Sequence, residues 1–421
     1  MTELAWIDAA LTAARPQAVG ALLRYFRDLD LAEEAYQDAC LRALKSWPQK
    51  GPPRDAAAWL IMVGRNAAID QTRRRSRQTE LPDEDQLSDL DDVETPLAER
   101  LDTADYRDDV LRLLFICCHP DLPATQQIAL ALRIVSGLSV PQIARAFLVG
   151  ESAMEQRITR AKGRIAKANV PFEAPGPIER AERLAAVAAM IYLVFNEGYS
   201  AGEVDDERAA LPLEAIRLAR LLLRLYPAEP EIMGLLALML LHHSRAAARF
   251  DAEGQIILMD DQDRRLWNRD MIGEGLALID KAIRHRRRGP YQVKAAIAAL
   301  HARAATPEDV DWPQIDALYQ ALEVMEPSPI VTLNRAVAVS KTRGAEAALA
   351  MIAPLEGQLG GYFNYFGAKG ALLKQLGRAG EARTAFNQAI ALATTPAQAA
   401  HIRQHLDQLA AEPAARSRPG A

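Results

Sequence analysis

The chain has 421 residues, and with 50% hydrophobic and 25% charged residues it is neither a mainly disordered nor a collagen-like polypeptide. Its 50 Lys and Arg residues and 55 Asp and Glu residues give a formal net charge of -5, which excludes a uniformly basic nucleic-acid coat but not local basic patches. Three cysteines exclude a disulfide-dense secreted scaffold, and the longest apolar runs, at 185–195 and 235–241, fall short of the ~20 residues that span a bilayer. The N-terminal residues lack the basic start and apolar core of a signal peptide, so we expect a cytoplasmic protein with no membrane partner.

The residue pattern predicts an all-α protein. Aromatic residues make up only 6% of the chain, and the abundance of Ala and Leu favours helices over strands. No segment shows a convincing strand period, and Pro and Gly mark the breaks between helical segments.

A helix predicted over 30–47 carries the first candidate surface. We expect its apolar face to consist of Leu31, Ala35, Leu41 and Leu44. Its other face displays polar side chains, those of Glu34, Gln37, Asp38 and Arg42. Such a face is either ordinary solvated surface or a surface that binds a partner.

A second helix, predicted over 57–77, combines an indole with amide and basic side chains. Trp59, Asn66 and Asp70 recur at helical spacing. The helix ends in a basic run, Arg73, Arg74, Arg75 and Arg77. An exposed indole here would offer single-stranded DNA a stacking platform, with hydrogen-bonding groups for base edges and cations for phosphates. The alternative is a core Trp59 and a solvated helix end, which this stretch taken alone slightly favours.

Residues 80–109 form a sharply acidic segment with few apolar residues, and Pro82 and Pro96 interrupt it. High like charge and low hydrophobicity predict a flexible linker.

The strongest local signal is a helix–turn–helix pattern over 138–165. We expect the turn at 148–150, with Gly150 free to adopt positive φ and Ser152 capping the following helix. That helix should bury Met154, Ile158, Ala161 and Ile165. Its other faces carry Ser152, Glu155, Gln156, Arg157, Arg160 and Lys162. A helix of this kind can enter the major groove of DNA; the alternative is a helical hairpin with a solvated basic face.

The last part of the chain suggests repeated helical pairs. Residues 365–392 read as two short helices joined at 377–380, a degenerate copy occupies 334–352, and 316–327 looks like a further second helix. Such tetratricopeptide-like pairs stack to share a core, and the alternative is an ordinary helical bundle.

Signals for metal, cofactor or catalysis are weak. Cys117, Cys118 and His119 are adjacent, but neighbouring helical residues diverge by about 100° and no second cysteine pair follows, so we predict buried thiols rather than a metal site. The sequence has no evident phosphate-cradling glycine loop and no evident catalytic constellation. We therefore expect no cofactor and no enzymatic activity.

Taken together, these segments resemble an extracytoplasmic-function sigma factor of bacterial RNA polymerase. Residues 31–47 resemble the helix that binds the polymerase clamp, 59–75 the helix that opens and reads the −10 element, and 143–165 the helix–turn–helix that reads the −35 element. The three segments occur in the family's order and spacing. The resemblance implies that the partners are core RNA polymerase and promoter DNA, as a duplex at −35 and as the non-template strand at −10.

The resemblance also implies three sets of site residues. Those for core polymerase are Glu34, Gln37, Asp38, Leu41 and Arg42. Those for the −10 element are Trp59, Arg65, Asn66, Asp70, Arg73 and Arg74. Those for the −35 element are Ser152, Glu155, Gln156, Arg157, Arg160 and Lys162.

The remaining sequence resembles a subgroup of these sigma factors with a long tetratricopeptide-like extension, through matching stretches at 196–200, 234–242, 261–267, 295–301 and 327–338. The expected organisation is sigma domain two at 1–79, the linker at 80–109, sigma domain four at 110–170, the extension at 171–412 and a disordered tail at 413–421. We expect the extension to have a regulatory or core-contacting role, either by binding a protein or peptide on its concave surface or by packing on the sigma domains and holding them.

The sequence departs from the family pattern at three positions. Cys40 stands where many members carry a larger apolar or aromatic residue, and Ala153 and Glu155 replace the common Thr and Lys. The −35 sequence that this chain would read therefore cannot be inferred from the sequences that other family members read. Two other hypotheses stay open, a stand-alone helix–turn–helix regulator with a repeat-built sensor and a repeat scaffold whose basic helices are incidental.

Overall fold

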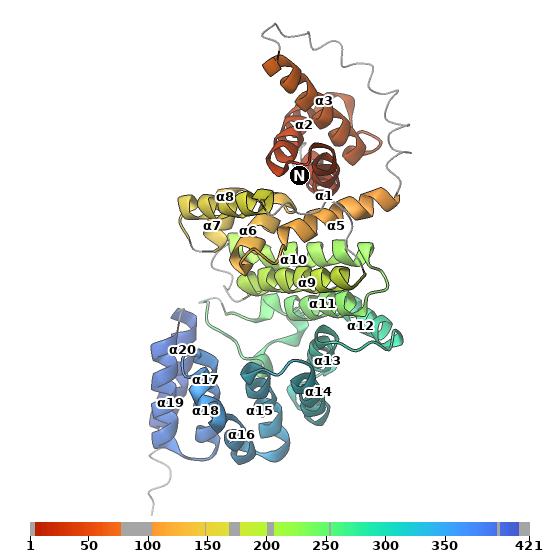
Figure 1. Cartoon of the computed structure of the whole chain (residues 1–421). Coiled ribbons are helices and arrows are strands. Elements are labelled where there is room, and N and C mark those ends of the chain that lie inside the picture. Colours follow the sequence, from red (N-terminus) through yellow and green to blue (C-terminus); the bar gives the residue numbers. More distant parts are fainter. Residues whose placement is uncertain are drawn as a thin grey trace, which may run out of the picture. The chain divides into compact units, whose positions relative to one another are not determined.

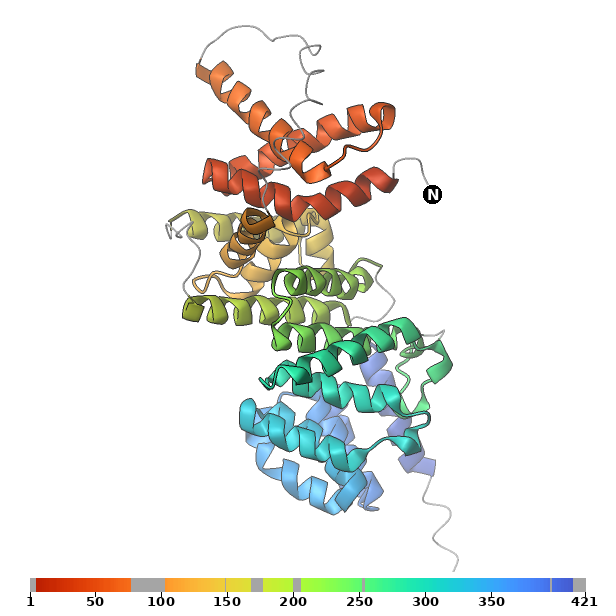
Figure 2. The same ribbon diagram turned by 90° about the vertical axis from the view of Figure 1, so that its right-hand side faces the viewer.

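The computed structural model describes residues 5–76, 103–147, 149–167, 177–199, 206–251, 254–393 and 396–411. In these ranges the regular elements are helices, and the one β-bridge joins Phe250 to Ile256 (Figures 1 and 2). The predicted all-α fold is therefore confirmed. The chain divides into two compact units, Met1–Ser200 with Glu207–Leu221 and Ala201–Asp206 with Leu222–Ala421. The tail predicted at 413–421 lies outside the described residues.

Three packed helices open the first unit, α1 (Ala5–Phe26), α2 (Leu29–Lys50) and α3 (Ala56–Ser76). The carboxylate of Asp28 starts α2 because it accepts hydrogen bonds from the backbone N–H groups of Asp30 and Leu31, at 2.9 and 3.0 Å. Helix α2 ends at Gly51, whose φ of 84° favours glycine.

The buried face of α2 differs from the predicted one. Its buried small side chains are Ala32, Ala35, Ala39 and Ala43. Leu41 and Leu44, which we expected on the apolar face, are 60% and 47% exposed. The cause is the close approach of α3, because a Cβ on Gly64 would lie 2.7 Å from the carbonyl oxygen of Ala35. At that spacing the contact favours small side chains over leucine.

The first unit continues with α5 (Thr103–Cys117), α6 (Ala124–Ile134), α7 (Val140–Ala146), α8 (Glu151–Lys167), α9 (Pro177–Tyr199) and α10 (Asp206–Leu225), of which Glu207–Leu221 belong to this unit.

Helix α5 begins inside the range 80–109 that the sequence assigned to a flexible linker, so that prediction is wrong from Thr103 onwards; residues 80–102 lie outside the described residues. Asp109 gives the physical reason. It is 2% exposed, and its carboxylate pairs with Arg112 at 2.9 Å and with Arg24 of α1 at 3.4 Å. These arginines offset its charge, so this acidic residue packs within a helix.

The second unit consists of short helices joined by tight turns: α11 (Pro230–His243), η2 (Ala246–Ala248), η3 (Met259–Asp261), η4 (Arg264–Leu266), α12 (Arg269–Arg284), α13 (Pro290–Arg303), η5 (Pro307–Asp309), α14 (Trp312–Met325), α15 (Pro329–Arg343), α16 (Ala345–Ile352), η6 (Ala353–Leu355), α17 (Glu356–Leu359), α18 (Phe363–Gln375), α19 (Ala379–Leu392) and α20 (Pro396–Ala411). Successive helices pack on one another, for example α14 on α15 and α18 on α19.

The helix pair predicted over 365–392 is confirmed as α18 and α19. Gly377 makes the turn with a φ of 72°, and Tyr365 and Phe386 are fully buried in the shared core. The degenerate copy at 334–352 likewise falls on α15 and α16, with Gly344 at the turn. The two helices of the first pair approach closely at Gly370, where a Cβ would lie 2.6 Å from the Phe386 ring.

Replacing Gly370 by Ala should destabilise the second unit by about 1–3 kcal/mol, because the added methyl group overpacks a buried aromatic ring. Hydrogen exchange of α18 and α19 measures the effect. Gly380→Ala is the matched control, since a Cβ there meets open space and alanine favours the helix. Equal protection in Gly370→Ala and in the unaltered chain would contradict the prediction.

A basic cluster surrounds Trp267 in the second unit. The indole is 2% exposed, and the guanidinium groups of Arg264 and Arg245 lie over its ring at 4.6 and 5.9 Å. Burial, together with the charge of Arg245, lowers the pKa of His242 to about 3 and that of His301 to about 4. Both imidazoles therefore stay neutral in the folded unit well below their ordinary pKa.

We expect the second unit to lose stability as the pH falls from about 6.5 towards 4, because the unfolded chain binds protons that these folded histidines do not. A histidine shielded from water changes the free energy of unfolding by about 1.4 kcal/mol per pH unit, and the partial exposure of both His242 and His301 reduces this contribution. Urea unfolding curves across this range measure the loss. His301→Gln should make the loss smaller, and a pH-independent midpoint would refute the expectation.

Candidate functional site

The helix–turn–helix predicted from the sequence corresponds to α7 and α8. Ser139 starts α7 through a capping box in which the Ser139 hydroxyl accepts from the Gln142 backbone N–H and the Gln142 side chain accepts from the Ser139 N–H. The apolar face predicted for α8 is confirmed, since its buried residues are Met154, Ile158, Ala161 and Ile165.

Two details of the predicted turn are wrong. Gly150 does not adopt a positive φ. Helix α8 already begins at Glu151, and the Gly150 carbonyl accepts the Met154 N–H at 3.0 Å, so Ser152 lies inside the first turn rather than at the cap. Neither position therefore needs the special conformation that the sequence suggested.

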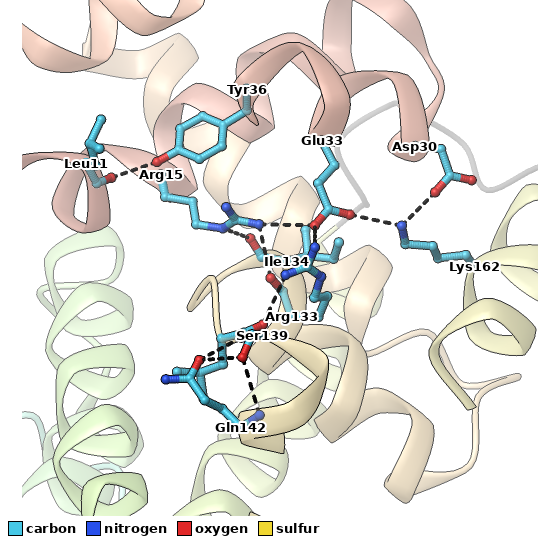
Figure 3. Close-up of polar contacts among 11 residues, drawn as sticks. Leu11, Arg15, Asp30, Glu33, Tyr36, Arg133, Ile134, Ser139, Gln142 and Lys162 are labelled. Atoms are coloured by element: carbon cyan, nitrogen blue, oxygen red, sulfur yellow. Dashed lines mark hydrogen bonds and ion pairs between the residues drawn. The ribbon is translucent and has the colours of Figure 1, made fainter. Parts of the chain in front are cut away.

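The polar residues predicted to read duplex DNA lie together on α8. The exposed ones are Ser152, Glu155, Gln156 and Arg160, and Arg157 is partly buried. Lys162 differs from them because its ammonium group contacts α2. It donates hydrogen bonds to the carboxylates of Asp30 at 2.6 Å and Glu33 at 2.9 Å (Figure 3).

The environment of Lys162 favours its charged form. Burial acts to lower the pKa of Lys162, but its hydrogen bonds to Asp30 and Glu33 and the negative charges of both carboxylates outweigh this effect and raise the pKa. The ammonium group predicted to contact a phosphate is thus already neutralised by two carboxylates of the same chain.

Glu33 is the central acceptor of this contact and was not predicted from the sequence. It is 4% exposed, and besides Lys162 its carboxylate pairs with Arg15 of α1 at 3.4 Å and Arg133 of α6 at 3.0 Å (Figure 3). Arg15 is itself buried, and it donates to the backbone carbonyls of Arg133 and Ile134. The sequence carries no clear signal for it, because Glu33 lies in an acidic stretch beside Glu34 and close to Asp30.

The residues predicted to bind core polymerase share one side of α2. Glu34, Gln37 and Leu41 are exposed, while Asp38 and Arg42 are partly exposed. Leu44 continues this surface towards the end of the helix.

The residues predicted to bind single-stranded DNA lie on α3. Trp59 is partly buried, with its ring edge-on to Trp47 at a centroid distance of 5.3 Å, so its indole is neither fully exposed nor in the core. Asn66 is partly buried and Arg65 is exposed. Asp70, Arg73 and Arg74 belong to the same helix, but their side chains lie outside the described residues.

Tyr25 is an aromatic neighbour of this surface that sequence reasoning missed. Its ring is 52% exposed at the end of α1, and the guanidinium of Arg65 lies 5.1 Å from the ring centroid. The contact joins residues that lie on different helices, so sequence spacing did not reveal it.

The weak metal signal is explained by packing. Cys117 and Cys118 are buried, and burial raises the pKa of both thiols, that of Cys118 to about 12. Among the described residues no His, Cys, Asp and Glu side chains group as a metal site would require. Across the described ranges no helix is both long and apolar enough to cross a membrane.

Comparison with known families matches residues 11–78 to Sigma-70 region 2 and residues 112–165 to Sigma-70 region 4. The first match covers α2, α3 and most of α1, and the second covers α6, α7 and most of α8. Residues 183–283 match a family of unknown function, DUF6596.

An uncharacterised protein of Rhizobium meliloti (strain 1021) is 71% identical over 415 residues, which cover 98% of each chain. No solved structure matches this chain. The chain thus carries matches to region 2 and region 4 in sequence order, and this pairing supports a sigma-70 family factor.

Proposed function

We propose that this chain is an extracytoplasmic-function sigma factor that acts in the cytoplasm, with sigma domain two at 1–79, sigma domain four at 110–170 and a regulatory tetratricopeptide-like extension at 171–412. The observation that supports it is the pairing of region 2 and region 4 matches on one chain. The chain would direct promoter-specific initiation without being an enzyme, because the polymerase carries out the chemistry.

Core RNA polymerase would bind the exposed side of α2. Leu41 is 60% exposed amid Glu34, Gln37 and Asp38. An exposed leucine gains free energy when a partner buries it, and the surrounding polar groups give the interface its register.

The −10 element would be opened and read on α3. Extruding a base costs a few kcal/mol in unstacking. The half-buried indole of Trp59 and the side chains of Arg65 and Asn66 would recover this cost by stacking, charge and hydrogen bonding to the non-template strand. Asp70, Arg73 and Arg74, which follow along α3, would complete the predicted set of −10 contacts.

The −35 element would be read by the exposed side of α8. Ser152 and Gln156, near the start of the helix, would bond base edges, and Arg157 and Arg160 would contact phosphates. Glu155 would accept a hydrogen bond from cytosine N4, which favours a C·G pair in the site.

A stand-alone helix–turn–helix regulator is the second candidate, since α7 and α8 alone would suffice for it. The region 2 match favours the sigma factor. In vitro transcription with the purified chain and core polymerase distinguishes the two candidates. The promoters for this assay are located by mapping transcript start sites after overexpression of the chain. A sigma factor should give specific initiation only together with core, whereas a regulator should footprint duplex DNA by itself.

Asn66→Ala should impair promoter opening at least fivefold while leaving holoenzyme assembly intact, because the lost amide hydrogen bond is worth about 1–3 kcal/mol. Permanganate footprinting measures opening, and a core-binding assay measures assembly. Leu41→Asp is the reciprocal control, since it should weaken core binding first. Equal losses of opening and assembly in Asn66→Ala would count against this role.

Removing the extension after Ala168 should alter promoter output or its regulation. The reason is that the extension makes up most of the second unit and offers stacked helical pairs on which a protein or peptide can bind. Reporter output of the shortened and full chains, compared at equal protein levels, measures the effect. Unchanged output and unchanged regulation would rule out the regulatory role.

A further inference from the structure

We propose that Asp30 and Glu33 form an acidic docking site on α2 that holds the recognition helix α8 in the free chain, so that this site and promoter DNA compete for Lys162. The inference rests on the proposed function, because it assigns the DNA-binding role to α8. The two carboxylates occupy the place that a DNA phosphate would take at the ammonium group (Figure 3).

The docking site combines an exposed carboxylate, Asp30, with a buried one, Glu33. Glu33 is 4% exposed, and the positive groups around it come from three different helices, Arg15 of α1, Arg133 of α6 and Lys162 of α8. If region 4 moved away from region 2, Glu33 would keep only Arg15 from its own region as a partner. A buried carboxylate that loses its partners is unfavourable, so the contact is stabilised as a unit.

Backbone packing supports the docked arrangement independently of charge. Glycine weakens the interior of a helix, yet Gly20 lies within α1. A Cβ at this position would lie 2.9 Å from the Asp109 carbonyl oxygen of α5. In the same way, a Cβ on Gly137, in the loop after α6, would lie 2.8 Å from the Arg15 side chain. Glycine therefore occupies two positions of close approach, one between α1 and α5 and one between Arg15 of α1 and the loop after α6, where the φ of 77° at Gly137 also favours glycine.

The docking site leaves most of the core-binding surface open. Asp30 lies on the same side of α2 as Gln37 and Leu41, because these positions are separated by nearly whole turns of the helix. Asp30 differs from them in lying at the N-terminal end of α2. Gln37 and Leu41 are exposed while Lys162 is engaged. Polymerase can therefore engage α2 first, and DNA gains Lys162 once α8 leaves Asp30. This order keeps the free chain from occupying promoters.

The test is the salt dependence of DNA binding by the full chain without polymerase, with a short duplex as the probe. Asp30→Asn and, separately, Gly20→Ala should release α8 without changing any residue of its DNA-facing side. Release of Lys162 adds one phosphate contact, so the slope of log K against log salt should become steeper by about 0.9. Asp8→Asn, an exposed change of the same charge on α1, should leave the slope unchanged.

Lys162→Ala completes the test. As a single substitution, Lys162→Ala should give the same slope as the unaltered chain. Combined with Asp30→Asn, it should abolish the increase in slope that Asp30→Asn causes alone. If Lys162→Ala lowers the slope of the unaltered chain, or if neither Asp30→Asn nor Gly20→Ala raises it, the docking site is refuted. Circular dichroism confirms that each variant is folded.

Initiation with core polymerase on a mapped promoter separates this inference from the proposed function. Predicted slopes without any core-dependent initiation would refute the sigma factor and retain the docking site. Core-dependent initiation with unchanged slopes would support the sigma factor and refute the docking site.

Discussion

The first unit depends on a carboxylate that is shielded from water. Glu33 is tolerated there only because three positive side chains from separate helices converge on it. This convergence ties segments far apart in the sequence, and it sets how the predicted DNA-facing helix meets the predicted polymerase-facing helix. Under the proposed function, the same contact would govern both stability and access to the DNA-binding side of α8.

Side-chain size decides which face of α2 is available to partners. Alanines occupy the face against α3, because the helices approach too closely for leucine. The leucines are consequently placed outside, at Leu41 and Leu44, where burial can occur only through binding. Helix α2 therefore buries Tyr36 and Trp47 but presents these two leucines to solvent.

Much of the local structure was predictable from spacing. The buried residues of α8 and the helix pair at α18 and α19 follow from apolar periodicity and from glycines at turns. The face of α2 was mispredicted because helical periodicity does not report how close the neighbouring helix lies. Glu33, Arg15 and Tyr25 escaped prediction for a related reason, since their partners are distant in sequence. The start of α5 was missed because the acidity of Asp109 is offset by arginines, one of them on another helix.

The arrangement of indoles in the first helices has an optical consequence. Trp6 stacks on Trp47 at a centroid distance of 6.1 Å, and Trp47 meets Trp59 at 5.3 Å, so three of the five tryptophans form one contiguous group. Rings this close exchange excitation energy. A nucleobase stacked on Trp59, at one end of the group, would therefore quench the emission of the whole group. If α3 binds the non-template strand as proposed, this group of indoles would report strand separation through its own fluorescence, without an attached dye.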